Sequence, residues 1–299
     1  MDNGQKDSKL FSDLEYLGFN KTDNWELYGS NTAGPEKQAV KEVEENKEKT
    51  LLYEREVICP VCETRFNARA VKVSAARTVS KDSDFFIRYS VINPYFYDVW
   101  VCNSCGYASM KKDFEYIKEH QIEHIKKNIT SRWRGRKYPE TYDLDIAIER
   151  YKLSLLNYAV RNAKNSSKAM NCLKIAWMYR LKEDVESEQT FLLQTLEGLE
   201  NAYYNEDFPM YGMDRFTTMY LIGELSRRTG NDEKAMQWFS KVITTTSVSP
   251  KLKDLARDQK DLIKFDHSHN DTDLSAPAAG EPAAEGSKKG FFRSIFRGL

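Results

Sequence analysis

The sequence lacks the long apolar stretches that would place the chain in a membrane. It has no apolar run of the roughly 18 residues that a membrane-spanning helix requires. Its first residues, from Met1 to Lys6, also lack the apolar core of a signal peptide. We therefore expect a cytoplasmic protein.

The sequence also lacks an excess of charge of either sign. Lys and Arg together number 45, as do Asp and Glu, so the formal net charge is zero. Such a chain has no overall field that would attract nucleic acid or an anionic membrane, and binding of either would depend on a local basic patch. A hydrophobic content of 40% is sufficient for packed cores, and 299 residues are sufficient for two domains.

Cysteine is scarce, and its placement is the strongest pattern in the sequence. Cys59 and Cys62 form one Cys-x-x-Cys hook, Cys102 and Cys105 form a second, and Cys172 lies outside both. Two such hooks can present four thiolates to one tetrahedral ion, with no coordination position left for water. We predict that these four residues bind a structural Zn²⁺ ion in a reducing compartment. A redox dithiol, another metal and free thiols are the alternatives.

The segment between the hooks is longer than the roughly 15–20 residues of the commonest spacing, so it needs structure of its own. Residues 65–73 and 97–102 alternate between apolar and polar side chains, which predicts a strand beside each hook. Gly106 follows the second hook and suits a turn with positive φ, whereas Glu63 follows the first, so we expect a less regular first knuckle. The pattern predicts a zinc-ribbon-like β module over residues 51–110.

Aromatic residues are dense in the second half of this module. They are Phe85, Phe86, Tyr89, Tyr95, Phe96, Tyr97 and Trp100. We expect these rings to pack the core of a module that has few other large apolar residues. The alternative is that they stack on bases beside Arg77, Lys81 and Arg88, as in single-strand binders.

Three stretches carry a resemblance to a known family. They are Asp-Phe-Phe-Ile-Arg-Tyr from Asp84, Asn-Pro-Tyr-Phe-Tyr from Asn93 and Val-Cys-Asn-Ser-Cys-Gly-Tyr-Ala from Val101. With its Cys-Pro-x-Cys start at Cys59, the chain resembles the uncharacterised bacterial family called domain of unknown function 2225. The resemblance extends to residues 14–19 and to the helical region that follows the β module. It implies no activity, because none is established for the family.

A helix is predicted directly after the β module. Between residues 111 and 130 apolar residues recur on one helical face, which indicates an amphipathic helix. It contains His120, Glu123 and His124 in the His-x-x-Glu-His pattern, in which two histidines bind a metal and the glutamate activates water. The pattern is short and no third ligand is identifiable, so a metal-dependent hydrolase is only an alternative. We expect a protein that is not an enzyme.

The most basic stretch follows this helix, and the two together occupy residues 111–141. Arg132, Arg134, Arg136 and Lys137 are interleaved with aromatic residues. Such a patch can contact phosphates, which makes a nucleic-acid-binding zinc-ribbon protein a further alternative. The patch is also typical of a charged loop between helices, and the neutrality of the whole chain favours that interpretation.

From residue 142 to residue 265 the pattern is helical throughout. The stretch 220–239 looks like a tetratricopeptide repeat, with Gly223 where two helices approach and Gly230 at the turn between them. Weaker matches to the repeat occur at Ala147, Tyr151, Ala176 and Tyr179. These matches predict about two and a half irregular repeats, and an irregular bundle without a groove is the alternative.

Three further segments flank these domains. Residues 1–50 are polar, and we expect them to be mostly flexible. Residues 266–287 are rich in Asp, Ala, Pro and Ser, which predicts a flexible tether. Residues 288–299 form a basic amphipathic tail, and we expect its part from Gly290 to Leu299 to dock on an anionic membrane surface or in a protein groove.

These patterns predict an α+β protein in which a small zinc-ribbon-like β module precedes an all-α, tetratricopeptide-like helical domain. We expect it to be a zinc-binding, non-enzymatic interaction scaffold in the cytoplasm, with protein partners at the helical domain. Docking of the tail would add peripheral attachment at the inner face of the membrane.

Overall fold

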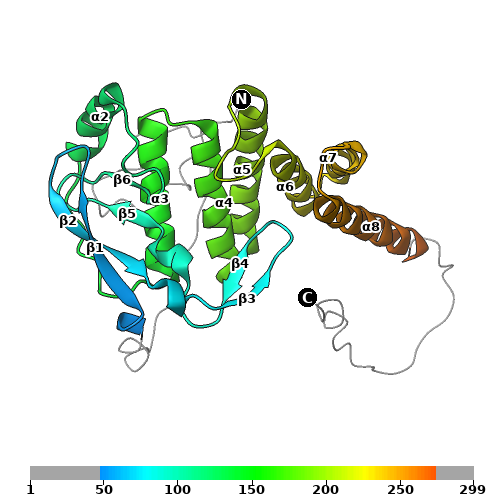
Figure 1. Cartoon of the computed structure of the whole chain (residues 1–299), viewed down its shortest axis with the longest axis horizontal. Helices are drawn as coiled ribbons and strands as arrows, with labels where there is room; N and C mark the ends of the chain where they lie inside the picture. The colour runs from blue at the N-terminus through cyan, green and yellow to red at the C-terminus, as the bar shows by residue number, and fades with distance from the viewer. Residues whose placement is uncertain (1–47, 274–299) are drawn as a thin grey trace. The chain divides into compact units, whose positions relative to one another are not determined.

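A computed structural model describes residues 48–273, in which three antiparallel strand pairs come first and seven α-helices follow (Figure 1). This order confirms the predicted α+β class. The chain divides into a first compact unit that ends at Lys260 and a second that begins at Asp261. The N-terminal residues before 48 and the tail from Gly290 to Leu299, for which we predicted flexibility and docking, lie outside the described residues.

Two of the strand pairs carry the cysteine hooks at their turns. Strand β1 (Leu52–Ile58) pairs with β2 (Arg65–Val71), and β5 (Val99–Val101) pairs with β6 (Ala108–Met110). Each hook begins at the residue that follows the first strand of its pair; the alternating pattern predicted β2 and β5, whereas β1 was not predicted. The two turns are thereby built alike.

The third pair, β3 (Thr78–Lys81) with β4 (Ile87–Tyr89), is a hairpin that was not among the strands predicted from the sequence. Phe86 at its turn is fully buried. A short 3-10 helix, Pro94–Tyr97, then leads to β5 and is capped by the side chain of Asn93. Of the aromatic residues of this region, Phe86, Tyr97 and Trp100 are buried and the others are half-buried, which is consistent with rings that pack a core.

The exit helix is shorter than the sequence predicted. Helix α2 spans Glu119–Ile125 and continues as a π-helix, Lys126–Thr130, while residues 111–115 form turns and residues 116–118 have no regular structure. In the turn segment the Phe114 ring packs 4.9 Å from that of Tyr107, and the Phe114 carbonyl accepts a hydrogen bond from the Tyr107 hydroxyl at 3.1 Å. The segment before α2 is thereby attached to the β module.

Six further helices make up the rest of the described chain. They are α3 (Leu144–Val160), α4 (Asn165–Leu181), α5 (Val185–Asn205), α6 (Arg215–Arg228), α7 (Asp232–Thr244) and α8 (Pro250–Asp273). Side chains of Asp143, Asp184, Asp214 and Asn231 each accept a hydrogen bond from a backbone N–H in the first turn of α3, α5, α6 and α7. These caps satisfy donors that a helix leaves free at its start, and they fix where the helices begin.

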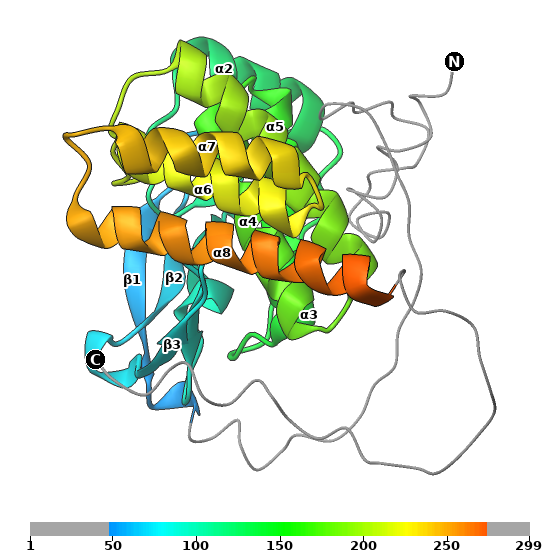
Figure 2. The same cartoon turned by 90° about the vertical axis from the view of Figure 1, so that its right-hand side faces the viewer.

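Consecutive helices pack as hairpins, with α4 against α5 and α6 against α7 (Figure 2). Gly223 lies where α6 and α7 come closest, because a Cβ at this position would stand 2.8 Å from the Phe239 ring. The predicted role of Gly223 as a contact point of two helices is therefore confirmed. Helix α3 packs on one side against α4 and on the other against β5 and β6.

Helix α8 runs to Asp273 and so extends past residue 266, where we expected the tether to begin. Neither Pro nor Gly occurs between Phe265 and Asp273, so no residue type in this stretch stops a helix. Of the helices described, none is both long enough and apolar enough to cross a membrane.

Candidate metal centre

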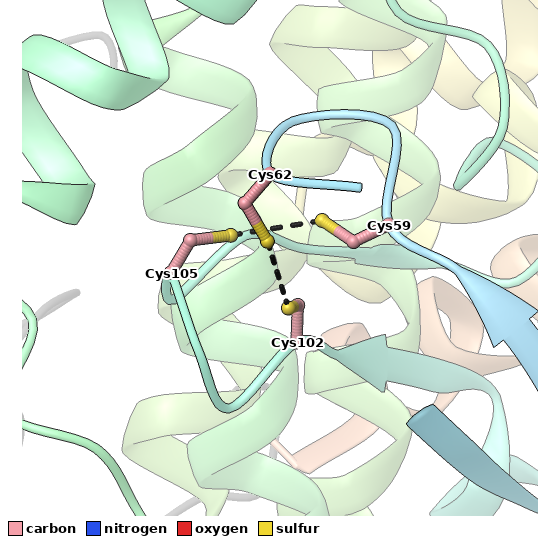
Figure 3. A group of neighbouring side chains, drawn as sticks. All are labelled: Cys59, Cys62, Cys102 and Cys105. Carbon is pink, nitrogen blue, oxygen red and sulfur yellow. Dashed lines mark hydrogen bonds between the residues drawn. The ribbon is translucent and has the colours of Figure 1, made fainter. Parts of the chain in front are cut away.

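The four hook cysteines come together at one point. Their Sγ atoms all lie within 4.8 Å of one another, and the pairs Cys59–Cys105 and Cys62–Cys102 are each separated by 3.6 Å (Figure 3). A disulfide bond would require about 2.05 Å, so the sulfurs are not cross-linked. Four sulfurs that each stand about 2.3 Å from a central ion form a tetrahedron with edges of about 3.8 Å. The group therefore fits a tetrahedral metal ion.

The two knuckles have the same backbone geometry. The N–H of Cys59 donates to the Thr64 carbonyl at 3.0 Å, and the N–H of Glu63 donates back to the Cys59 carbonyl at 2.8 Å. Cys102 makes the equivalent pair with Tyr107 and Gly106, at 2.8 Å in each case. Glu63 adopts φ 61° and Gly106 adopts φ 77°. The expected irregularity of the first knuckle is thus absent from its hydrogen bonds, because Glu63 accepts a backbone conformation that is costly for a residue with a Cβ.

Burial makes the group depend on a cation. Cys59, Cys102 and Cys105 are inaccessible or nearly so, and Cys62 is partly exposed. The hydrogen bond with Cys102, together with burial, raises the pKa of Cys59, whereas hydrogen bonds from Cys105 and Cys59 lower the pKa of Cys102. One thiolate is therefore stabilised by the neighbouring thiols, and four thiolates require a positive ion among them.

The basic stretch predicted as a phosphate-contact candidate covers the second knuckle. The indole Nε1 of Trp133 donates to the Asn103 carbonyl at 2.8 Å, and the backbone N–H of Arg136 donates to Asn103 Oδ1 at 2.6 Å. Trp133 also packs so close to Gly106 that a Cβ there would lie 2.7 Å from its ring. The loop from residue 131 to residue 138 is therefore part of the support of the metal centre.

The four cations of this loop have different surroundings. Arg136 forms an ion pair with Glu149 on α3 at 3.2 Å, and Arg132 is partly buried. Arg134 and Lys137 are exposed. The patch thus presents two exposed cations, Arg134 and Lys137, whereas Arg136 is paired with Glu149 and Arg132 is partly buried.

Helix α3 holds the second knuckle from the other side. Asn157 Nδ2 donates to the Gly106 carbonyl at 3.3 Å, and a guanidinium N–H of Arg150 donates to the Val99 carbonyl. The Tyr158 hydroxyl accepts from the backbone N–H of Met110 at 3.2 Å. Sequence analysis missed these supporting residues, because nothing in the local pattern of α3 indicates which of its polar side chains face the β module.

The His-x-x-Glu-His residues do not form a metal site with the rest of the described chain. His120, Glu123 and His124 are all exposed on or beside α2. Among the residues that the structure describes, only the four hook cysteines form a group of three or more possible metal ligands within reach of one ion. No third ligand lies beside His120 and His124 among the residues whose side chains the structure describes, 48–267.

Cys172 lies apart from this centre, on α4. Its side chain is fully buried, and burial raises the pKa of the thiol above its usual value. A protonated, inaccessible thiol is unreactive, as is typical of a cysteine that packs in a core.

A cluster of charged residues that sequence analysis did not identify joins the β3–β4 hairpin to α4. Asp84 is fully buried, and its carboxylate accepts hydrogen bonds from Trp177 Nε1 at 3.0 Å and from Arg180 Nη2 at 2.7 Å. Arg180 also binds Asp82 at 3.0 Å and Glu188 at 2.7 Å. One guanidinium thereby links the hairpin to two helices, and its hydrogen bonds offset the cost of burying Asp84.

The same hairpin contacts α6. The Ser83 hydroxyl donates to the Glu224 carboxylate at 2.6 Å, and the Ser83 carbonyl accepts from the Tyr220 hydroxyl at 3.0 Å. The Phe85 ring lies 5.4 Å from that of Tyr220. The hairpin tip, residues 82–86, therefore occupies a surface formed by α4 and α6 together.

Comparison with known proteins gives one family. A family model described as "Uncharacterized protein conserved in bacteria (DUF2225)" matches residues 52–263, from β1 into α8. The match includes the four hook cysteines and the hairpin tip, but not residues 14–19, to which the sequence resemblance also extended. Searches of curated proteins and of solved structures each gave no match.

Proposed function

The chain belongs to the bacterial family DUF2225, and from this premise we propose that it is a zinc-binding, non-enzymatic interaction scaffold. The observation that carries the proposal is the closed group of four sulfurs within 4.8 Å of one another. Tetrahedral sites with four sulfur ligands are typical of zinc and of iron–sulfur chemistry, and the ribbon-like pair of knuckles favours a single Zn²⁺ ion.

A structural role for the ion follows from the same geometry. Four thiolates complete the tetrahedron and leave no position for a substrate or an activated water, which catalytic zinc sites keep open. The ion would instead join the β1–β2 turn to the β5–β6 turn. These two strand pairs belong to separate sheets. Metal binding would therefore contribute directly to folding of the β module.

The scaffold part of the proposal rests on the helices. The hairpins α4–α5 and α6–α7 suit a tetratricopeptide-like arrangement, in which the first helix of each pair lines a shared surface. That surface, on α4 and α6, carries the hairpin tip of the chain itself. A partner would consequently bind elsewhere on the helical domain.

Helix α5 offers such a surface. Val185, Leu193 and Tyr204 are 67%, 52% and 68% exposed on this helix, whereas Leu196 between them is buried. Large apolar side chains that stay exposed can contribute to a surface that binds protein. We assign the partner to the side of α5 that carries these three residues.

The assignment is tested by crosslinking and pull-down from the native cell. We expect that Leu193→Asp combined with Tyr204→Asp removes a specific partner that the unchanged chain retains. Val73→Asp is the matched control, because Val73 is 94% exposed and lies in the β module. Partners that are the same for all three proteins would contradict the α5 assignment.

The surroundings of the alternative sites give them less support. Nucleic-acid binding by the 131–138 loop would depend on its two exposed cations. Trp133 and Arg136 of the same loop instead cover the second knuckle. A hydrolase would need a third ligand beside His120 and His124.

The proposed compartment is the cytoplasm, because cysteines without disulfide bonds suit a reducing environment. Docking of the tail from Gly290 to Leu299 on a membrane or in a groove stays a prediction.

A further inference from the structure

A cavity of about 300 Å³ lies between the end of the β module and α4. Its lining includes three cations, Lys111, Lys112 and Lys174, but a single acid, Asp98. The size is at the lower end of the range that small-molecule sites occupy, roughly 300–1,000 Å³. The cavity is separate from the cysteine centre, since none of the four hook cysteines lines it.

The charges of the cavity do not balance. The Asp98 side chain, 9% exposed, forms ion pairs with Lys111 at 3.3 Å and with Lys174, so one carboxylate serves two ammonium groups. Lys174 is itself only 15% exposed, so water stabilises its charge less than it would on an open surface. Asp113 lies outside the lining but accepts a hydrogen bond from Tyr211, which lines it, so its charge offsets only part of the excess of the three lysines.

The third cation strengthens this imbalance. The Lys112 ammonium stands 5.0 Å from the centre of the Tyr211 ring, and no ion pair with a carboxylate is found for it among the described residues. The Tyr211 hydroxyl donates to Asp113, which fixes the ring under Lys112. A recess lined by charge of one sign concentrates counter-ions of the other sign.

The rest of the lining is apolar. Met110, Met170 and Trp177 contribute to the walls, and Trp177 is held in place by its hydrogen bond to Asp84. One part of the cavity carries converging positive charges, and another part offers thioether and aromatic surface. Such a cavity suits a ligand that has an anionic group at one end and an apolar body at the other.

We propose that this cavity binds a small organic anion, in which a phosphate or carboxylate group lies between Lys112 and Lys174 and an apolar or flat body contacts Met170 and Tyr211. Bound in this way, the ligand would contact the β module through Lys112, helix α4 through Lys174 and the α5–α6 connection through Tyr211. The inference is independent of the scaffold role and of the metal.

The experiment is isothermal titration calorimetry of the full chain with phenyl phosphate, inorganic phosphate and phenol. We expect phenyl phosphate to bind with one site per chain and more tightly than either of its halves, because only it engages both the cations and the apolar wall. Lys112→Met and Lys174→Met should each weaken its binding by about tenfold, as expected for loss of one charge-assisted contact.

Lys127→Met is the matched control, since Lys127 is exposed in the exit segment and does not line the cavity. It should leave the affinity unchanged. Lys112 is exposed, so its substitution tests the site without a risk to folding. Absence of phenyl phosphate binding at millimolar concentration overturns the proposal. So does binding that both cavity variants retain, or affinity for inorganic phosphate equal to that for phenyl phosphate.

Discussion

Arg180 and Asp84 are 96 positions apart in the chain, yet Arg180 Nη2 donates to an Asp84 carboxylate oxygen at 2.7 Å, and Nη1 donates to the other oxygen at 3.0 Å. The acid is fully buried and the arginine side chain is 10% exposed. A bidentate pair of this kind fixes both distance and orientation. The hairpin of the β module and the first helix of the α4–α5 pair are consequently held in one arrangement, and the α4–α6 surface is already occupied.

Asp84→Asn should destabilise the protein strongly. The substitution keeps the shape of the side chain but removes the negative charge that pairs with the buried Arg180. Breaking a buried ion pair in this way typically costs about 3–5 kcal/mol. We expect a loss of this size in the free energy of unfolding measured with urea. Asp145→Asn is the control, because the pair of Asp145 with Lys182 is exposed and should contribute no more than about 1 kcal/mol. Equal effects of the two substitutions would contradict a stabilising role for the buried pair.

The contribution of Asp84 should also depend on pH. Burial alone would raise the pKa of Asp84, but hydrogen bonds from Arg180 and the charges of Arg228 and Arg180 outweigh it and lower the pKa. A carboxyl whose pKa is lower in the folded state stabilises the fold above its unfolded pKa, about 3.9, and loses that effect as the pH falls through its folded pKa. The difference in unfolding free energy between the unchanged protein and Asp84→Asn should therefore shrink below about pH 4. A difference that stays constant from pH 7 to acid conditions would show that the charge of Asp84 is not involved.

What sequence could predict is what depends on local spacing. The two hooks predicted that Cys59, Cys62, Cys102 and Cys105 meet, because a metal needs all four and the Cys-x-x-Cys spacing is a local geometric constraint. Alternation predicted a strand beside each hook. The helical repeat pattern likewise predicted the approach of two helices at Gly223.

What sequence could not predict depends on which distant residues meet. Asp84 and Glu224 are fully buried charges, yet acidic residues are expected from their type to be exposed. Their burial requires Arg180 and Arg228, which come from other segments of the chain. The role of the basic loop likewise depends on a distant contact, since Trp133 packs against Gly106 although β6, α2 and the π-helix lie between them in the chain.

Gly106→Ala tests the contact between the second knuckle and the basic loop. Gly106 has φ 77°, and a Cβ there would lie 2.7 Å from the Trp133 ring. Gly212 has φ 82° with nothing within 4 Å of the added Cβ, so Gly212→Ala measures the backbone cost alone, about 1–2 kcal/mol. We expect Gly106→Ala to exceed Gly212→Ala in lost unfolding free energy by at least about 1 kcal/mol.

A double-mutant cycle identifies the source of that excess. If the excess comes from Trp133, then Gly106→Ala should cost less in a Trp133→Ala background, where the added methyl group has room. Strictly additive losses would show that Trp133 is not the group that restricts position 106.

The last prediction concerns the ion itself. We expect the full chain, purified under reducing conditions without chelator, to contain one zinc per chain by elemental analysis, and Cys105→Ser to lose it, because three thiolates no longer complete the tetrahedron. Cys172→Ala is the matched control, since Cys172 is buried in α4 away from the centre, and it should retain the metal. Removal of zinc should increase amide hydrogen exchange across β1, β2, β5 and β6, whose two turns the ion joins, while α6 and α7 stay protected. Iron in place of zinc would contradict the identity of the ion. Unchanged exchange after metal removal would contradict its structural role, because the β module would then be held without the ion, by packing against the rest of the chain.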